Sequence, residues 1–259
     1  MTFSPSFASG SRTGAPALEV RLCRGGISES VHRVHAVVCD QRGRVLMRAG
    51  DPQQLSFIRS ALKPFQAQVF VSSGAADLGG HDDRALAIAC ASHAGEAAQA
   101  REAFKILWKA DLETEQLQCP TPAGRTSPLE HNCSGKHAAF LATCRRLHWP
   151  LESYLQTDHP LQQQVLKRVG ELLGMPGAEL VTARDDCGAP TLQLQLAQMA
   201  LLFAHLGGGE QPDADPRHAD RAEFVEHLVD HRRERHRQVG TGPQGNMHVR
   251  LASDGGRAR

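Results

Sequence analysis

The feature that most constrains the fold is a change of hydrophobic period between the first fifty residues and the rest of the chain. Apolar residues alternate with polar ones at Leu18, Val20 and Leu22, the period of a strand with one face buried. Turn-forming residues at 40–43 separate "HAVVCD" from "RVLMRAG" and predict antiparallel strands on either side. From residue 60 onward the period becomes helical. Strands followed by a block of helices predict an α+β domain, an antiparallel sheet beside a helical region.

Seven helices are predicted from this periodicity. Asp82 and Asp220 suit helix N-caps, and Pro160 and Pro190 suit first-turn positions. The predicted segments are 60–73, 82–93, 95–110, 135–148, 158–174, 190–206 and 220–233.

Composition excludes several classes of protein. A net charge of +1 gives no reason to expect nucleic acid or an anionic membrane as the main partner. No apolar run reaches the length of a membrane span, and the first residues lack the apolar core of a secretory signal. Seven cysteines, an odd number at irregular spacing, argue against a disulfide framework. We therefore predict a cytoplasmic protein with reduced thiols.

The stretch "FIRSALKPFQ" places Ser60 and Lys63 three residues apart. If it opens a helix, the lysine amine can reach the serine hydroxyl, and a desolvated lysine can remove the hydroxyl proton. Pro64 fits a helix only within the first turn, because further along it clashes with the preceding turn. The alternative is an N-cap serine followed by a solvent-facing lysine, and these four letters alone favour that alternative.

A second serine stands at the end of an apolar segment, in "ACASHAGE". Ser92 and His93 precede Gly95, which suits a helix end opening into a tight turn. A serine there either points into a cleft or forms a local turn.

Two cysteine-containing stretches are also candidates for chemistry. In "EHNCSGKHAAF", Cys133 and Lys136 lie three apart at a predicted helix N-terminus, which favours an anion or a thiolate. In "RDDCGAP", Asp185 and Asp186 precede Cys187. The distance between the two cysteines along the chain is no zinc signature, so spacing alone favours buried structural cysteines over a metal site.

Together these stretches resemble the type III L-asparaginases, the asparaginase II family typified by rhizobial enzymes. The most specific matches are "CSGKH" at 133–137 and "DCGAP" at 186–190. The other matching segments are "RGGISESVHR", "GDPQQLSFIRSALKPFQA", "SGAADLGG", "LAIACASHAGE" and "YLQTDHPLQQQVL". The resemblance implies a fold similar to serine β-lactamases and serine-dependent glutaminases. It also implies a homodimer that hydrolyses L-asparagine to L-aspartate and ammonia through an activated serine.

Site residues follow from the resemblance position by position. The candidate catalytic residues are Ser60 and Lys63 as one Ser-Lys tandem and Ser92 as the serine of a second. The candidate zinc ligands are Cys133, Lys136 and Cys187. The candidate substrate-binding residues are Arg59, His93, Asn132 and Asp185. From charge we assign Asp185 to the substrate amino group and Arg59 to its carboxylate, and we expect Ser60 to be the nucleophile because it keeps its lysine.

The C-terminal part departs from the family pattern. We predict a disordered lead-in at 1–17, an asparaginase-like catalytic domain at 18–206, and a divergent helix with a basic tail at 207–259. No lysine follows Lys167, so Ser92 lacks the family's second lysine. We therefore expect a fold incomplete at the C-terminus, through truncation or a frame shift near residue 207 or 230, and an impaired site. The alternatives are a non-catalytic relative that binds an amino acid or zinc, and hydrolysis of another amide such as glutamine or a lactam.

Overall fold

The computed structural model describes residues 14–40 and 42–208 and divides the chain into two compact units. One unit holds the described residues up to Ser56 together with those from Gln195 onward, and the other is Phe57–Leu194. Residues 1–13 of the lead-in predicted at 1–17, the cap at Asp220, and the helix and basic tail beyond Gly208 lie outside the described residues. Within the described ranges, every helix is too short or too polar to cross a bilayer.

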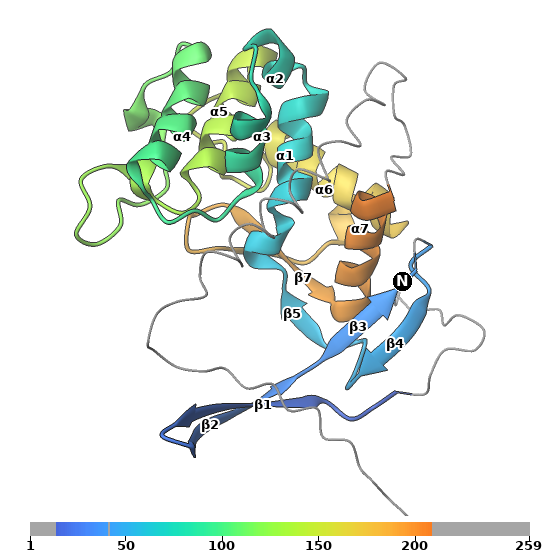
Figure 1. The fold of residues 1–259 in the computed structure, drawn as a ribbon. Helices are drawn as coiled ribbons and strands as arrows, with labels where there is room; N and C mark the ends of the chain where they lie inside the picture. The colour runs from blue at the N-terminus through green and yellow to red at the C-terminus, as the bar shows by residue number, and fades with distance from the viewer. Residues whose placement is uncertain (1–13, 41, 209–259) are drawn as a thin grey trace, which may run out of the picture. The chain divides into compact units, whose positions relative to one another are not determined.

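The first unit is built on two antiparallel hairpins and one helix (Figure 1). Strands β1 (Leu18–Arg24) and β2 (Ile27–Val34) pair with Val20 opposite His32, and β3 (Ala36–Cys39) pairs with β4 (Val45–Ala49). The predicted turn is confirmed, since the Gly43 N–H donates to the Asp40 carbonyl at 2.9 Å. Helix α7 (Leu196–Gly208) packs on β3, where the Cys39 thiol donates to the Ala200 carbonyl.

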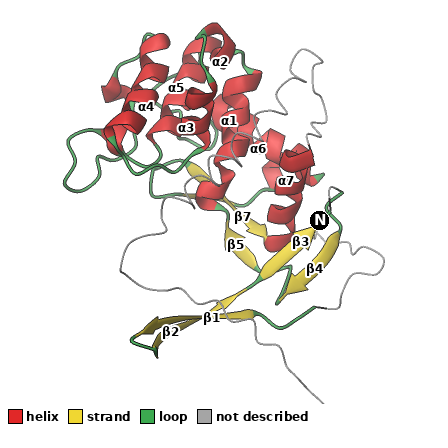
Figure 2. Ribbon diagram, in the orientation of Figure 1, coloured by secondary structure: helices red, strands yellow, loops and turns green. Residues whose placement is uncertain are grey.

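The second unit is a helical bundle around one buried helix (Figure 2). Helix α5 (Ser134–Leu147) is buried continuously from its first residue to Cys144 and packs against α1, α3 and α4. The surrounding helices are α1 (Lys63–Ser72), α2 (Ala75–Leu78), α3 (Asp83–Cys90), α4 (Ala97–Lys109) and α6 (Pro160–Leu173). A helix buried all round needs apolar or small residues on every face, and "AAFLATC" supplies them.

Most predicted helices of this unit are confirmed, with their caps. Asp82 accepts the Ala85 N–H at the start of α3, and Pro160 is at the first turn of α6. Pro64 also falls in a first turn, because α1 begins at Lys63 and the preceding Arg59–Leu62 is a short 3₁₀ helix. The proline therefore costs α1 no internal hydrogen bond.

The helix predicted over 190–206 is wrong in its first six residues. Pro190–Gln195 form strand β7, which pairs antiparallel with β6 (Thr182–Arg184), Thr182 lying opposite Leu192. The sequence "LQLQ" alternates with period two, and its leucines are buried. Pro190 was interpreted as a helix start, but it opens a strand, a position that its missing N–H allows. The α+β class is confirmed.

Candidate functional site

All candidate site residues lie in the helical unit. The first segment of the site is the turn from Arg59 to Lys63, where the 3₁₀ helix meets α1. Arg59 has a φ of 50°, which is uncommon for a residue with a side chain. Its N–H donates to the Thr191 hydroxyl at 2.9 Å, which ties the strained residue to β7. This hydrogen bond thus anchors the turn to the neighbouring strand.

Ser60 and Lys63 point to different environments. Ser60 is exposed, and no described residue forms a hydrogen bond with its hydroxyl. Lys63 is 1% exposed, and its Nζ lies 2.7 Å from the Ser92 Oγ. The amine therefore reaches the second candidate serine, from the turn after α3, rather than the serine of its own turn.

Two backbone carbonyls complete the surroundings of the Lys63 amine. Nζ donates to the carbonyl of Ala91 at 2.9 Å and to that of Asn132 at 3.1 Å. The Ala91 carbonyl is available because α3 ends at Cys90 and the chain becomes extended there. Burial lowers the pKa of Lys63, while the nearby Cys133 thiolate opposes that shift.

Two glycines allow the segments around this amine to approach one another. Gly95 has a φ of +74°, and a Cβ there would collide with the Glu130 carbonyl. Gly135, in the first turn of α5, lies against the Ile88 carbonyl of α3 so closely that a Cβ would also collide. The end of α3 and the start of α5 therefore meet backbone to backbone, and the carbonyls just beyond these two ends, of Ala91 and Asn132, both accept from the Lys63 amine.

Behind Lys63, the two cysteines form a buried pair. Cys133 is 4% exposed and Cys187 is 2% exposed, and their side chains are close enough for each to shift the pKa of the other. The interaction with Cys187 is the main cause that lowers the pKa of Cys133 to about 6, and the positive charges of Lys136 and Lys63 act in the same direction. Sharing the proton raises the pKa of Cys187. The Lys136 Nζ donates to the Cys187 sulfur at 3.1 Å.

The exposed end of the site is an ion-pair cluster. Arg59 lies 2.8 Å from the Asp185 carboxylate and also pairs with Asp186. The Asp185 carbonyl accepts the Gly188 N–H, so a tight turn presents both carboxylates beside Cys187. Opposite charges held side by side suit a zwitterion such as an amino acid. Its carboxylate can replace an aspartate as the partner of Arg59, and its amino group can replace Arg59 as the partner of an aspartate.

His93 and Asn132 both form hydrogen bonds within the protein, His93 through its ring and Asn132 through its backbone carbonyl. His93 is buried; its Nδ1 accepts the Gly95 N–H and its Nε2 lies 2.9 Å from the Ser134 hydroxyl. Because that hydroxyl donates to the Leu129 carbonyl, both ring nitrogens of His93 are engaged within the protein. The Asn132 side chain is exposed while its carbonyl holds Lys63. Contact of either residue with substrate stays a prediction.

Three contributors to the site were not predicted from the sequence. The carbonyls of Ala91 and Asn132 have no signature in residue type, because any residue supplies a carbonyl. Asp186 had a signal, its charge beside Asp185, but its pairing with Arg59 required the fold.

The described residues contain no group of three or more histidine, cysteine or carboxylate side chains that could hold a metal ion. The set that the sequence predicted has two sulfurs and one amine. These three groups do lie together, since Cys187 contacts both Cys133 and Lys136. Two soft sulfur donors side by side are the ligand type that a thiophilic metal such as zinc prefers, so the donor set fits that metal.

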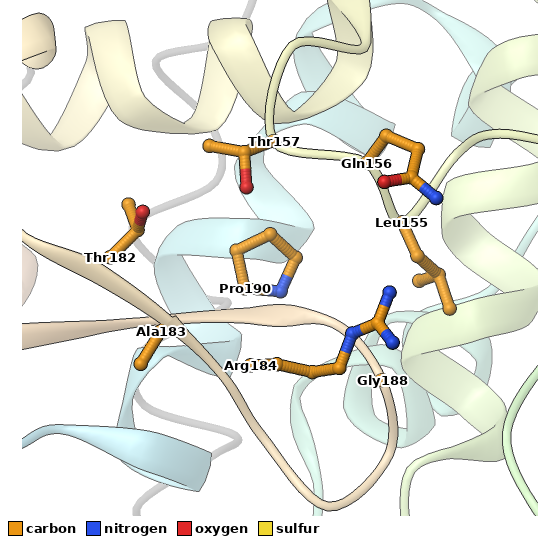
Figure 3. A pocket seen from close by; sticks show the side chains of 8 residues that line it. All are labelled: Leu155, Gln156, Thr157, Thr182, Ala183, Arg184, Gly188 and Pro190. Atoms are coloured by element: carbon orange, nitrogen blue, oxygen red, sulfur yellow. The ribbon is translucent and has the colours of Figure 1, made fainter.

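A small cavity lies next to the Asp185–Gly188 turn, since Gly188 is one of its lining residues. It has a volume of about 150 Å³, and Figure 3 shows Pro190 between Thr157 and Arg184. Its remaining lining residues are Leu155, Gln156, Thr182, Ala183 and Gly188. None of the candidate catalytic residues lines it, so the serine and lysine groups do not open into this cavity.

The geometry and the motifs agree with one comparison. The chain matches the L-asparaginase II family over residues 20–239. It therefore belongs to the L-asparaginase II family, whose membership implies amidohydrolase activity on a small-molecule substrate and suggests asparagine hydrolysis. No curated protein matched the chain.

Proposed function

We propose that this protein hydrolyses L-asparagine to L-aspartate and ammonia through a serine activated by Lys63. The observation that carries the proposal is the set of three partners around the Lys63 Nζ. A neutral amine has two N–H bonds and one lone pair. If the N–H bonds donate to the two carbonyls, the lone pair points at the Ser92 hydroxyl and can accept its proton. Burial lowers the pKa of Lys63 and so favours the neutral form that this step needs.

The reaction then proceeds in two balanced steps. Ser92 Oγ attacks the side-chain amide carbon while its proton passes to Lys63, and the departing nitrogen takes that proton and leaves as ammonia. A water molecule attacks the resulting ester and gives a proton to Lys63, and Lys63 passes that proton to the departing Ser92 oxygen, so that aspartate and the free serine are released. Ser60 was expected to be the nucleophile. The bond between Lys63 and Ser92 favours Ser92, with Ser60 at the exposed edge of the same site.

Recognition of the substrate would use the ion-pair cluster. Arg59 matches an α-carboxylate and Asp185 an α-amino group, and their 2.8 Å separation brings the two sites next to each other. The side-chain amide of a bound asparagine then extends away from both charges. Pocket length decides between asparagine and glutamine by only about 1–3 kcal/mol per methylene.

A zinc ion is part of the proposal. Cys133, Lys136 and Cys187 would hold it, with Lys136 as the neutral amine. When bound, zinc would supply a positive charge that polarises nearby groups. We further propose a homodimer of serine β-lactamase-like fold.

The second candidate function is binding of an amino acid or zinc without turnover. It is favoured by the surroundings of Ser60, since no lysine among the described residues contacts its hydroxyl. The binding function requires that a single pair of one serine and one lysine is insufficient for amide hydrolysis.

Ammonia release from L-asparagine, measured for three serine variants, tests the proposal. Ser92→Ala should abolish turnover, and Ser60→Ala should reduce it less. Ser72→Ala, at the exposed last residue of α1, is the matched control and should behave as the unmodified protein. Folded, zinc-loaded protein that binds asparagine but releases no ammonia would support the binding function instead. Turnover that survives Ser92→Ala but not Ser60→Ala would overturn the assignment of the nucleophile.

A further inference from the structure

A buried polar pair lies directly behind the thiol pair. Tyr154 and His137 are both 0% exposed, and the Tyr154 hydroxyl lies 2.7 Å from Nδ1 of His137. Their rings meet edge to face, with centroids 5.6 Å apart. A buried tyrosine hydroxyl and a buried imidazole are both costly unless hydrogen-bonded, so their arrangement calls for a physical account.

Proton accounting fixes the direction of the hydrogen bonds. The Gln118 N–H donates to the Tyr154 oxygen at 2.9 Å. The tyrosine proton is then free to be donated to Nδ1 of His137. If His137 instead donated from Nδ1, the tyrosine proton would have no acceptor, because the described residues offer no third partner to this hydroxyl. A neutral imidazole carries one proton, so that proton lies on Nε2.

The other ring nitrogen of His137, Nε2, makes no hydrogen bond within the described residues. The side chains of His137 and Cys187 are close enough for each to shift the pKa of the other, and Nε2 is the ring nitrogen left to face that sulfur because Nδ1 is bonded to Tyr154. Sulfur is a weak acceptor with a long and tolerant contact. An N–H held toward it, together with the Lys136 Nζ that donates to the same sulfur, restricts where that sulfur can point.

We infer that Tyr154 and His137 are positioning residues that fix the histidine proton on Nε2 and thereby orient the sulfur of Cys187. The inference rests on the proposed function for the use of that sulfur in holding zinc. It does not need the serine chemistry. Partners of this kind behind a metal ligand typically change metal affinity by about 10–100-fold when they are removed.

The tautomer of His137 is the first measurement. Long-range proton–nitrogen NMR on protein labelled with ¹⁵N-histidine distinguishes a proton on Nδ1 from one on Nε2. The His137 signals are identified by their loss in His137→Gln. We expect the proton on Nε2 in the unmodified protein and a mixture of tautomers in Tyr154→Phe. A proton on Nδ1 in the unmodified protein, or the same tautomer in both proteins, would overturn the inference.

The link to Cys187 is tested with a pair of cysteine variants. Cys187→Ala should move the Nε2–H signal of His137. Cys144→Ala removes another buried thiol of the same unit and should leave that signal in place. Equal responses to the two substitutions would show that His137 does not act on Cys187.

Zinc affinity separates positioning from a merely structural role. In competition with a chromophoric chelator, Tyr154→Phe should bind zinc about 10–100-fold more weakly than the unmodified protein. Thr143→Val is the control, because it removes a fully buried hydroxyl that bonds the Ala139 carbonyl within α5. Equal losses of zinc affinity in the two variants would show that Tyr154 has only a structural role. If the unmodified protein binds no zinc, the metal part of the proposed function fails, and the tautomer alone decides the inference.

Discussion

The turn at Ser60–Lys63 and the turn at Cys133–Lys136 have the same spacing but use their lysines differently. Each places a buried lysine three residues after a nucleophilic side chain. Lys63 contacts two carbonyls and Ser92, whereas Lys136 contacts the Cys187 sulfur. In both turns the lysine bonds a residue from another segment. Spacing therefore predicts where a lysine stands, and the fold decides which group it serves.

The largest expected effect separates the two lysines by activity. Lys63→Met should lower kcat for asparagine by about 10²–10⁴-fold, the contribution of a general base. Lys136→Met should mainly weaken zinc binding and lower kcat less. Steady-state ammonia release with zinc analysis checks both, and Lys167→Met, an exposed lysine of α6, is the control. Equal losses of kcat in the two buried variants would remove the distinction between the turns.

A smaller effect distinguishes the turns by packing. Gly135→Ala should destabilise the protein by about 1–3 kcal/mol, because the new Cβ meets the Ile88 carbonyl of a neighbouring helix. Ala61→Gly, at an exposed position of the other turn, should cost about 0.5–1 kcal/mol. Urea unfolding measures both changes. A neutral Gly135→Ala would mean that α3 and α5 can separate at this point.

Substrate affinity should depend on the exposed end of the first turn. Arg59→Gln should raise KM for asparagine about tenfold with little change in kcat, since one charge-assisted contact to the carboxylate is lost. The matched control is Arg84→Gln, an exposed arginine of α3. A fall in kcat at unchanged KM would assign Arg59 to the chemical step instead.

The smallest effect concerns the loop that leads into the second turn. The N–H of Thr126, followed by Arg125 and the N–H of Ser127, holds the pKa of Glu130 below its usual value. A depressed pKa means that the ionised form adds stability above the ordinary pKa, and that this stability is lost as pH falls through the folded value. Glu130→Gln should therefore be slightly destabilising at neutral pH and equal to the unmodified protein in strong acid. Unfolding curves at both pH values check this, and a difference that grows in acid would contradict it.

Local pattern predicted the helices well and one strand badly. The helical period before β6 is set by residues close in sequence, and α1, α3, α4, α5 and α6 lie where it placed them. The segment from Pro190 was assigned to a helix because a proline suits a first turn. The alternation in "LQLQ" and the turn at 185–188 are local signals of the hairpin that this segment forms with β6, and the proline signal conflicts with them.

The candidate site was predicted as a set of residues but not as a set of contacts. Lys63, Ser92, Cys133, Lys136 and Cys187 do come together. The pairing of Lys63 with Ser92 could not be predicted, because it depends on where α3 ends and on two glycines that let backbones approach. Backbone acceptors such as the Ala91 carbonyl cannot be predicted from residue type, because every residue has a carbonyl.

The continuous burial of α5 has a consequence for measuring this unit. Every residue from Ser134 to Cys144 is shielded from solvent, and neighbouring helices cover the helix on several sides. Its central amide protons can reach deuterated water only when those neighbours separate. Hydrogen–deuterium exchange at α5 should therefore report the free energy of opening the helical unit as a whole.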